Sequence, residues 1–213
     1  MNPNTRLRML YKKHWPSINK CMKDIPNLSG PTVIDIPDSY FNSRTKLMII
    51  GQQTFGWNRG SLERLLKDYR DFNFGEKWYQ SPFWNMTSKI TTILGVSRYS
   101  IAWTNLVKCE YKKQRPPENI EEKVQSAFPV LSKEISILSP DLVLFFTGPN
   151  YDERLLRSLP RSSFEKVGNY PERYLTQVSS PSLPKNSFRT YHPQFLRRSG
   201  KEKNFLNFIK RIM

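Results

Sequence analysis

The chain has 213 residues, 34 of them basic and 18 acidic, which gives a net charge of +16. This length favours one domain with a sizeable core, and an aromatic content of 13% excludes a disordered chain. The positive excess favours a polyanionic partner, above all a nucleic acid. Cys21 and Cys109 are too few for a disulfide framework, a four-cysteine zinc site or an iron–sulfur cluster.

Residues 1–45 predict a helix followed by an irregular connection. Leu7, Tyr11 and Trp15 recur at helical spacing, and Pro16 is expected to kink the helix. Basic residues lie between these apolar positions, so we interpret the segment as a helix packed on the sheet with a solvated face. A helix that contacts nucleic acid is the alternative. The basic N-terminus has no apolar stretch typical of a signal peptide, and no apolar run approaches the length of a membrane span.

The rest of the chain alternates between apolar strands and helical periodicity. Four strands are predicted, at 46–51, 101–107, 141–148 and 187–191, and helices at 61–69, 82–94, 118–139, 150–159 and 201–213. Residues 160–186 are rich in Pro and Ser and predict a loop, with a weak extended segment near Leu175. The pattern indicates an α/β fold: a three-layer α/β/α sandwich with a central, mainly parallel four-stranded sheet, formed by residues 1–213 as one domain.

Right-handed crossovers bring the carboxyl ends of parallel strands to one edge of a sheet, where such folds build their sites. Polar, aromatic and basic residues follow each predicted strand, at 52–58, at Asn105, at 147–150 and at 192–198. We therefore expect these four regions to converge on one cleft.

Three short motifs at these strand ends resemble those of the uracil-DNA glycosylase superfamily. The segment 49–56, IIGQQTFG, resembles the strand and loop that hold the water-placing residue, and 103–108, WTNLVK, resembles the strand end whose Asn reads the base. The segment 191–196, YHPQFL, is similar to HPSPL, and the apolar strand at 142–148 resembles the one that precedes it in that family. The resemblance covers roughly residues 46–200.

The resemblance implies roles for particular residues. Gln53 would place the water, Asn105 would hydrogen-bond the flipped base, and His192 would stabilise the departing base anion. These residue types suit that chemistry, because an Asn amide offers both a donor and an acceptor and a His N–H can face a developing negative charge. Phe74 is the candidate for stacking on the base, with Phe55 behind it.

The same resemblance implies DNA contacts beside His192. Leu196, with Phe195, would enter the duplex where the base was, and Arg197 and Arg198 would hold phosphates. Lys108, in the basic loop after the second strand, is a further candidate for DNA contact.

The sequence departs from the family pattern at the first motif. Gln53 stands where the best-known branch has Asp, and a Gln amide can orient water but cannot act as a base at neutral pH. Thr54, Gly56 and Gln194 replace other usual residues. These departures leave the base undetermined, so a modified pyrimidine is an alternative to plain uracil.

The sequence thus predicts a monofunctional DNA glycosylase that flips a uracil-like or modified base and hydrolyses its N-glycosidic bond, with no metal or cofactor. A variant in which His192 attacks the sugar is not favoured by any residue. Two alternatives stay open: an inactive family member that binds damaged or modified DNA, and an unrelated α/β nucleic-acid-binding protein. We expect an intracellular, cytoplasmic monomer that is associated with the nucleoid when bound to DNA, in either repair or defence against phages. Strand preference is not determined.

Overall fold

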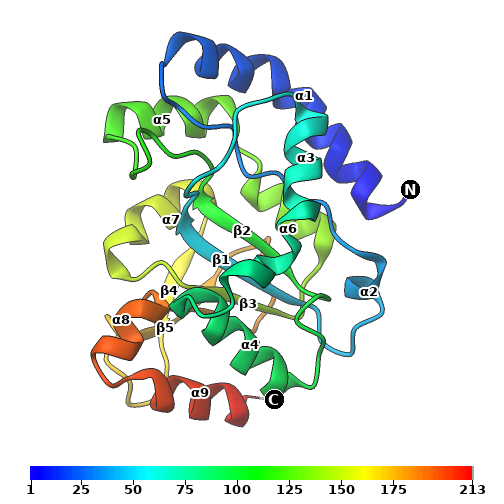
Figure 1. Cartoon of the computed structure of the whole chain (residues 1–213). Coiled ribbons are helices and arrows are strands. Elements are labelled where there is room, and N and C mark those ends of the chain that lie inside the picture. Colours follow the sequence, from blue (N-terminus) through cyan, green and yellow to red (C-terminus); the bar gives the residue numbers. More distant parts are fainter. Residues whose placement is uncertain (213) are drawn as a thin grey trace.

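The computed structural model describes residues 1–212 and consists of a six-stranded sheet between two layers of helices (Figure 1). The strand order is β2-β1-β3-β6-β5-β4. The strands are β1 (Leu47–Gln53), β2 (Ala102–Val107), β3 (Leu142–Phe145), β4 (Ser163–Lys166), β5 (Leu175–Ser179) and β6 (Ser187–Thr190). The first four in spatial order are parallel, whereas β5 and β4 are antiparallel to their neighbours.

The α/β class is confirmed, but the predicted four-stranded sheet is wrong because β5 and β4 extend it. The weak extended segment near Leu175 is β5, which pairs with β6. β4 lies at the edge of the sheet and is mostly exposed, so its sequence lacks the apolar run that identifies a strand.

Helices occupy most of the predicted positions. They are α1 (Pro3–Asp24), α2 (Asp38–Phe41), α3 (Leu62–Asp71), α4 (Pro82–Leu94), α5 (Glu118–Ala127), α6 (Leu131–Leu138), α7 (Asp152–Ser158), α8 (Pro193–Arg198) and α9 (Glu202–Arg211), with 3₁₀ turns η1 (Asn73–Trp78) and η2 (Pro149–Tyr151). The single helix predicted over 118–139 is two helices, because the ring of Pro129 excludes the helical conformation from Phe128, whose φ and ψ are −138° and 60°.

Two apolar clusters cover the two faces of the sheet. α1 packs against α5 and α6 on one face, and α4 packs against α8 and α9 on the other (Figure 1). Leu7, Tyr11, Ile18 and Met22 of α1 are buried. Leu7 and Tyr11 are among the predicted apolar positions, whereas Trp15 is only partly buried. Within residues 1–212, no helix combines the length and apolar character needed to cross a membrane.

The register of the sheet positions the first two motifs side by side. Gly51 of β1 pairs with Asn105 of β2, and Gln53 pairs with Val107. His192 follows β6, which lies beyond β3 from this pair. The predicted convergence at the carboxyl edge therefore places Asn105 on one side of β1 and His192 on the other.

Candidate active site

A cleft of about 740 Å³ opens at the carboxyl edge of the parallel strands. It collects residues from the loop after β1, from the α3–α4 region, from β2 and from the segment after β6. Its lining comprises Gly51, Gln52, Gln53, Thr54, Phe55, Gly56, Trp57, Asn58, Asp68, Asp71, Phe72, Lys77, Trp78, Ser81, Phe83, Trp84, Trp103, Asn105 and His192. Gln53, Asn105 and His192, which the sequence assigned to one site, thus share this cleft.

Gly51 makes room for Asn105. A Cβ at position 51 would lie 2.5 Å from the Asn105 side-chain oxygen, closer than atoms approach without a shift. Asn105 is 8% exposed, and no other residue among 1–212 forms a hydrogen bond with its amide. The donor and acceptor groups of this amide are therefore free to hydrogen-bond the edge of a base.

His192 is held as a neutral donor. It is the N-cap of α8, where its Nδ1 accepts the backbone N–H of Gln194 at 3.2 Å. Burial lowers the pKa of His192 to about 4, because removal from water disfavours the charged ring. A neutral imidazole that accepts at Nδ1 carries its proton on Nε2. The cleft therefore contains an N–H donor without a net charge.

Gln53 is oriented by a tyrosine. The Tyr151 hydroxyl, from η2, donates to Gln53 Oε1 at 2.6 Å. Arg115 and Arg154 lie over the Tyr151 ring at 5.6 and 5.3 Å from its centroid. A carbonyl oxygen has two lone pairs, so Gln53 keeps one acceptor site and both amide donors for a ligand. The neighbouring Gln52 instead donates to the Thr147 carbonyl at 2.8 Å and ties β1 to the loop after β3.

Phe83 lines the cleft, whereas the predicted Phe74 does not. Phe83 begins α4, packs nearly parallel to the His192 ring at 6.1 Å, and lines the cleft beside Gly51. Phe74 is not among the lining residues and packs edge-on against Tyr99. Phe55 does line the cleft and is 76% exposed at its rim. Sequence reasoning missed Phe83 because its place depends on how α4 approaches β1.

The segment after His192 divides into exposed and buried side chains. Phe195 is 48% exposed and packs against Tyr191, whereas Leu196 is 0% exposed and belongs to the core beneath α8. The structure therefore does not present Leu196 as a wedge. Arg197 donates to Asn85 at 2.8 Å and pairs with Glu202 at 3.4 Å, which connects α8 to α4 and α9.

Arg198 is exposed at the same end of α8. Over residues 1–212 it has no carboxylate within ion-pair distance. It therefore remains available to a phosphate.

The prediction that Lys108 contacts DNA does not hold, because its side chain is only 3% exposed. Its ammonium donates to Glu134 and to Thr104, both at 2.5 Å. Glu134 in turn accepts the Tyr11 hydroxyl at 2.8 Å, so α1, β2 and α6 meet at this pair. Burial lowers the pKa of Lys108, and the Glu134 carboxylate opposes that shift. Lys108 is a structural cation.

The exposed cations of this loop lie a few residues further on. Lys112 and Lys113 form the tip of a tight turn, in which Tyr111 and Gln114 exchange two backbone hydrogen bonds of 2.9 Å. Both lysines adopt left-handed backbone conformations, with φ of 50° and 58°. The loop adjoins the cleft, because Glu110 accepts the N–H of Gly56 at 2.9 Å. The turn thus presents two cations beside the loop that lines the cleft.

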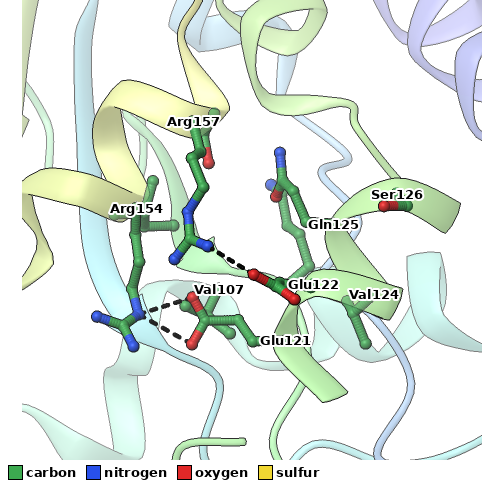
Figure 2. Close-up of a pocket in the computed structure, with 11 residues that line it drawn as sticks. Val107, Glu121, Glu122, Val124, Gln125, Ser126, Arg154 and Arg157 are labelled. Carbon is green, nitrogen blue, oxygen red and sulfur yellow. Dashed lines mark hydrogen bonds and ion pairs between the residues drawn. The ribbon is translucent and has the colours of Figure 1, made fainter. Parts of the chain in front are cut away.

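A second hollow, of about 340 Å³, lies between α5 and α7. Figure 2 shows that its charged side chains face one another: Arg154 pairs with Glu121 at 2.6 Å, and Arg157 pairs with Glu122 at 3.1 Å. Because each guanidinium already meets a carboxylate, this hollow is a contact between two helices and not a site. Within residues 1–212, no group of three or more His, Cys, Asp or Glu side chains is arranged to hold a metal ion.

Comparison with known proteins agrees with the motifs at the cleft. A family model described as the Uracil DNA glycosylase superfamily matches residues 39–212. A type-4 uracil-DNA glycosylase from Saccharolobus solfataricus is 29% identical over 109 residues. That alignment covers 51% of this chain and 48% of the relative, so the chain matches about half the length of this curated protein.

Proposed function

Because the chain belongs to the uracil DNA glycosylase superfamily, we propose that it is a DNA glycosylase that removes a uracil-like or modified pyrimidine from DNA. The observation that carries this proposal is the state of His192: a partly buried, neutral ring whose Nδ1 is occupied and whose Nε2–H remains for a ligand. Such a donor suits a leaving group that becomes negative as its bond breaks.

The proposed reaction begins with extrusion of the base into the cleft. Asn105 hydrogen-bonds the Watson–Crick edge, and Phe83 provides the aromatic surface against which the base stacks. Phe195 fills the space left in the DNA stack, a role that its 48% exposure supports. Extrusion costs a few kcal/mol, which these contacts offset in part.

Cleavage then breaks the bond between C1′ of the sugar and N1 of the base. The bonding electrons leave with the base, and His192 donates from Nε2 to the O2 oxygen on which negative charge develops. A water held by the remaining Gln53 acceptor attacks C1′ and loses a proton to solvent. Because Gln53 cannot take that proton itself, we expect departure of the base to be more advanced than attack by water in the transition state.

Exposed cations around the cleft support DNA as the partner. Arg198 lies on α8, the helix that His192 caps, and Lys112 and Lys113 lie in the turn of the loop whose Glu110 accepts the N–H of Gly56. Cations in these positions neutralise phosphates and fix the register of the strand, while the cleft selects the base.

A second candidate function is that of an inactive relative that binds modified DNA without cutting it. The observation that favours it is the amide at Gln53, where a carboxylate would be the stronger aid to hydrolysis.

The two candidates differ in the product. Purified protein is incubated with oligonucleotides carrying single uracil, 5-hydroxymethyluracil or hypoxanthine residues, and abasic sites are revealed by alkaline scission. Cleavage that is lost in Asn105→Ala is the expected result. Tight DNA binding without cleavage of any modified pyrimidine would instead support the inactive relative.

A further inference from the structure

The cleft extends well beyond the space that a flipped pyrimidine needs. Its volume of about 740 Å³ is within the range of about 300–1,000 Å³ found for pockets that enclose a whole drug-sized ligand. Gly51, Gln53, Phe83, Asn105 and His192, which we assign to the base, make up only part of its lining. The remaining part, which we call the outer chamber, comprises Trp57, Asn58, Asp68, Asp71, Phe72, Lys77, Trp78, Ser81, Trp84 and Trp103.

Aromatic rings form the walls of the outer chamber. Trp103 is the centre of the cluster, with Trp57 at 5.9 Å, Trp84 at 5.4 Å and Phe72 at 5.2 Å between ring centroids. Trp84 and Trp103 are 8% and 6% exposed, whereas Trp78 is 63% exposed at the lip. A ligand group that enters here therefore meets the exposed Trp78 indole and part of the Trp57 ring, with Trp84 and Trp103 largely covered beneath them.

Two of these indoles have unused hydrogen-bond donors. The Nε1 atoms of Trp57 and Trp103 are buried, and neither has a partner in the described chain. Buried tryptophan N–H groups usually find an acceptor, because leaving one unpaired costs free energy. Because both atoms are covered in the free protein, a ligand oxygen would reach these donors only after the neighbouring rings shift.

Polar side chains complete the chamber. Asn58 donates to Asp68 at 3.0 Å, and Asp71, Lys77 and Ser81 lie further along the lining. A carboxylate accepts hydrogen bonds from hydroxyls, and an amide both donates to them and accepts from them. Flat aromatic faces pack against the C–H faces of a sugar ring. The combination suits a ligand that is rich in hydroxyls and has apolar faces.

The chamber lies where a substituent of the base would point. In a pyrimidine, C5 is directly opposite C2, so a group on C5 points away from an O2 oxygen held by His192. His192 follows β6, whereas Trp103 is on β2, beyond β1 and β3. Trp103 and Asn105 are two residues apart on β2 and so share a face. A C5 substituent would thus extend past Asn105 toward Trp103.

The outer wall of the chamber is built on unusual backbone. Asn73, Phe74 and Gly75 all have left-handed conformations, with φ of 45°, 52° and 67°. Non-glycine residues in this conformation are strained, and such strain is concentrated at functional sites. A Cβ at Gly75 would collide with the Trp84 ring, so this tight turn fixes one wall and leads directly to Trp78.

From these features we propose that the outer chamber binds a bulky, hydroxyl-rich substituent on C5 of the excised pyrimidine, such as a glycosylated hydroxymethyl group. The inference rests on the proposed glycosylase function and names its substrate class. The base itself is held by Asn105, Phe83 and His192, and the aromatic cluster selects the substituent.

The test compares single-site oligonucleotides that carry uracil, 5-hydroxymethyluracil and glucosylated 5-hydroxymethyluracil, with the corresponding cytosine series. The expected result, in at least one series, is a kcat/KM for the glucosylated base about tenfold or more above that for the unsubstituted base, the size expected from one added aromatic stacking contact. Equal or slower excision of the glucosylated base overturns the inference and leaves the glycosylase function intact.

Trp78→Ala sharpens the test, because this side chain is 63% exposed and can be removed without opening the core. It should lower excision of the glucosylated base about tenfold and that of the unsubstituted base less than twofold. Tyr79→Ala is the matched control: Tyr79 is the next residue, is 44% exposed, and does not line the cleft. An equal loss on both substrates in Trp78→Ala contradicts a chamber specific for the substituent.

If no base in either series is excised, the glycosylase proposal fails. Binding of the same oligonucleotides then tests separately whether the chamber recognises the substituent. About tenfold tighter binding of glucosylated DNA, lost in Trp78→Ala, supports the chamber. Equal affinity for glucosylated and plain DNA overturns it.

Discussion

His192 and Lys108 occupy comparable places in the fold but differ in their hydrogen-bond partners. Each is a basic side chain just after a parallel strand, β6 or β2, and each is removed from most solvent. Burial lowers the pKa of both. Lys108 donates to the Glu134 carboxylate and to a hydroxyl at 2.5 Å, whereas within residues 1–212 the His192 ring hydrogen-bonds only to a backbone N–H.

Whether a buried basic group remains able to bind a ligand depends on the partner that it contacts. Lys108 with Glu134 is a closed ion pair whose hydrogen-bonding atoms are turned to each other, so it contributes to structure and offers nothing to a ligand. Within the described residues 1–212, His192 has no carboxylate partner. Its ring therefore becomes neutral and keeps a donor for a ligand in the cleft. The comparison predicts that one residue controls stability and the other controls chemistry.

The largest expected effect is the loss of stability in Lys108→Met. Removing one member of a buried pair leaves Glu134 charged and unpaired, which costs about 3–5 kcal/mol in the free energy of unfolding. Urea denaturation measures this loss. Lys112→Met, an exposed lysine of the same loop, is the control and should change stability by less than about 0.5 kcal/mol. A Lys108→Met protein as stable as the parent would show that the pair is not closed.

His192→Ala should have a large effect on the catalytic rate and a small one on stability, the reverse of Lys108→Met. Loss of one donor to a developing anion lowers kcat about 100- to 1,000-fold, while the free energy of unfolding changes much less than in Lys108→Met. Single-turnover excision and urea denaturation are measured on the same preparation. Gln194→Ala is the control, because it keeps the backbone N–H that holds the ring and removes only an exposed side chain. Parental activity in His192→Ala would remove His192 from the chemistry.

The pH profile tests the neutral state of His192. With a pKa of about 4, roughly nine-tenths of the ring is neutral at pH 5, whereas an ordinary histidine of pKa about 6.5 would be only about 3% neutral there. Excision should therefore be retained at pH 5. Half-maximal activity near pH 6.5, traceable to His192, would contradict the buried neutral donor.

The same group gives stability a pH dependence of known sign. The unfolded chain binds a proton at His192 below about pH 6.5, and the folded chain does so only below about pH 4. The unfolded state thus binds more protons between these values, so His192 makes the protein less stable as the pH falls from about 6.5 to 4. Denaturation at several pH values should show this slope, and His192→Gln should reduce it.

The sequence predicted the parallel core of the fold and most of the cleft because both depend on local patterns. The strands that became β1, β2, β3 and β6 are apolar runs, and the direction of parallel strands fixes which ends meet. That logic predicts that Gln53, Asn105 and His192 lie close together. It could not find β4, whose side chains are exposed and carry no apolar signal.

The errors at the site have one physical cause: they concern partners distant in the chain. Lys108 was assigned to DNA because its neighbours are basic, and its partner Glu134 is 26 residues away, on α6. Leu196 was assigned as a wedge by its motif position, yet the packing of α8 on α4 and α9 buries it. Phe83 replaced Phe74 because α4 presses against Gly51. Tertiary contacts decide each of these cases.

The smallest expected effect is on the salt dependence of DNA binding. It compares a paired cation, Arg197, with an unpaired one, Arg198, at the surface of α8. Arg198 is exposed and, in the described chain, unpaired, so Arg198→Ala should weaken DNA binding and reduce the dependence of log Kd on log salt by about 0.7–0.9, one phosphate contact. Arg197 already engages Asn85 and Glu202, so Arg197→Ala should change the salt slope less and loosen α8 instead. Equal slopes for the two variants would mean that DNA recruits Arg197 away from its protein partners, and that a partner seen in the free protein does not by itself remove a cation from binding.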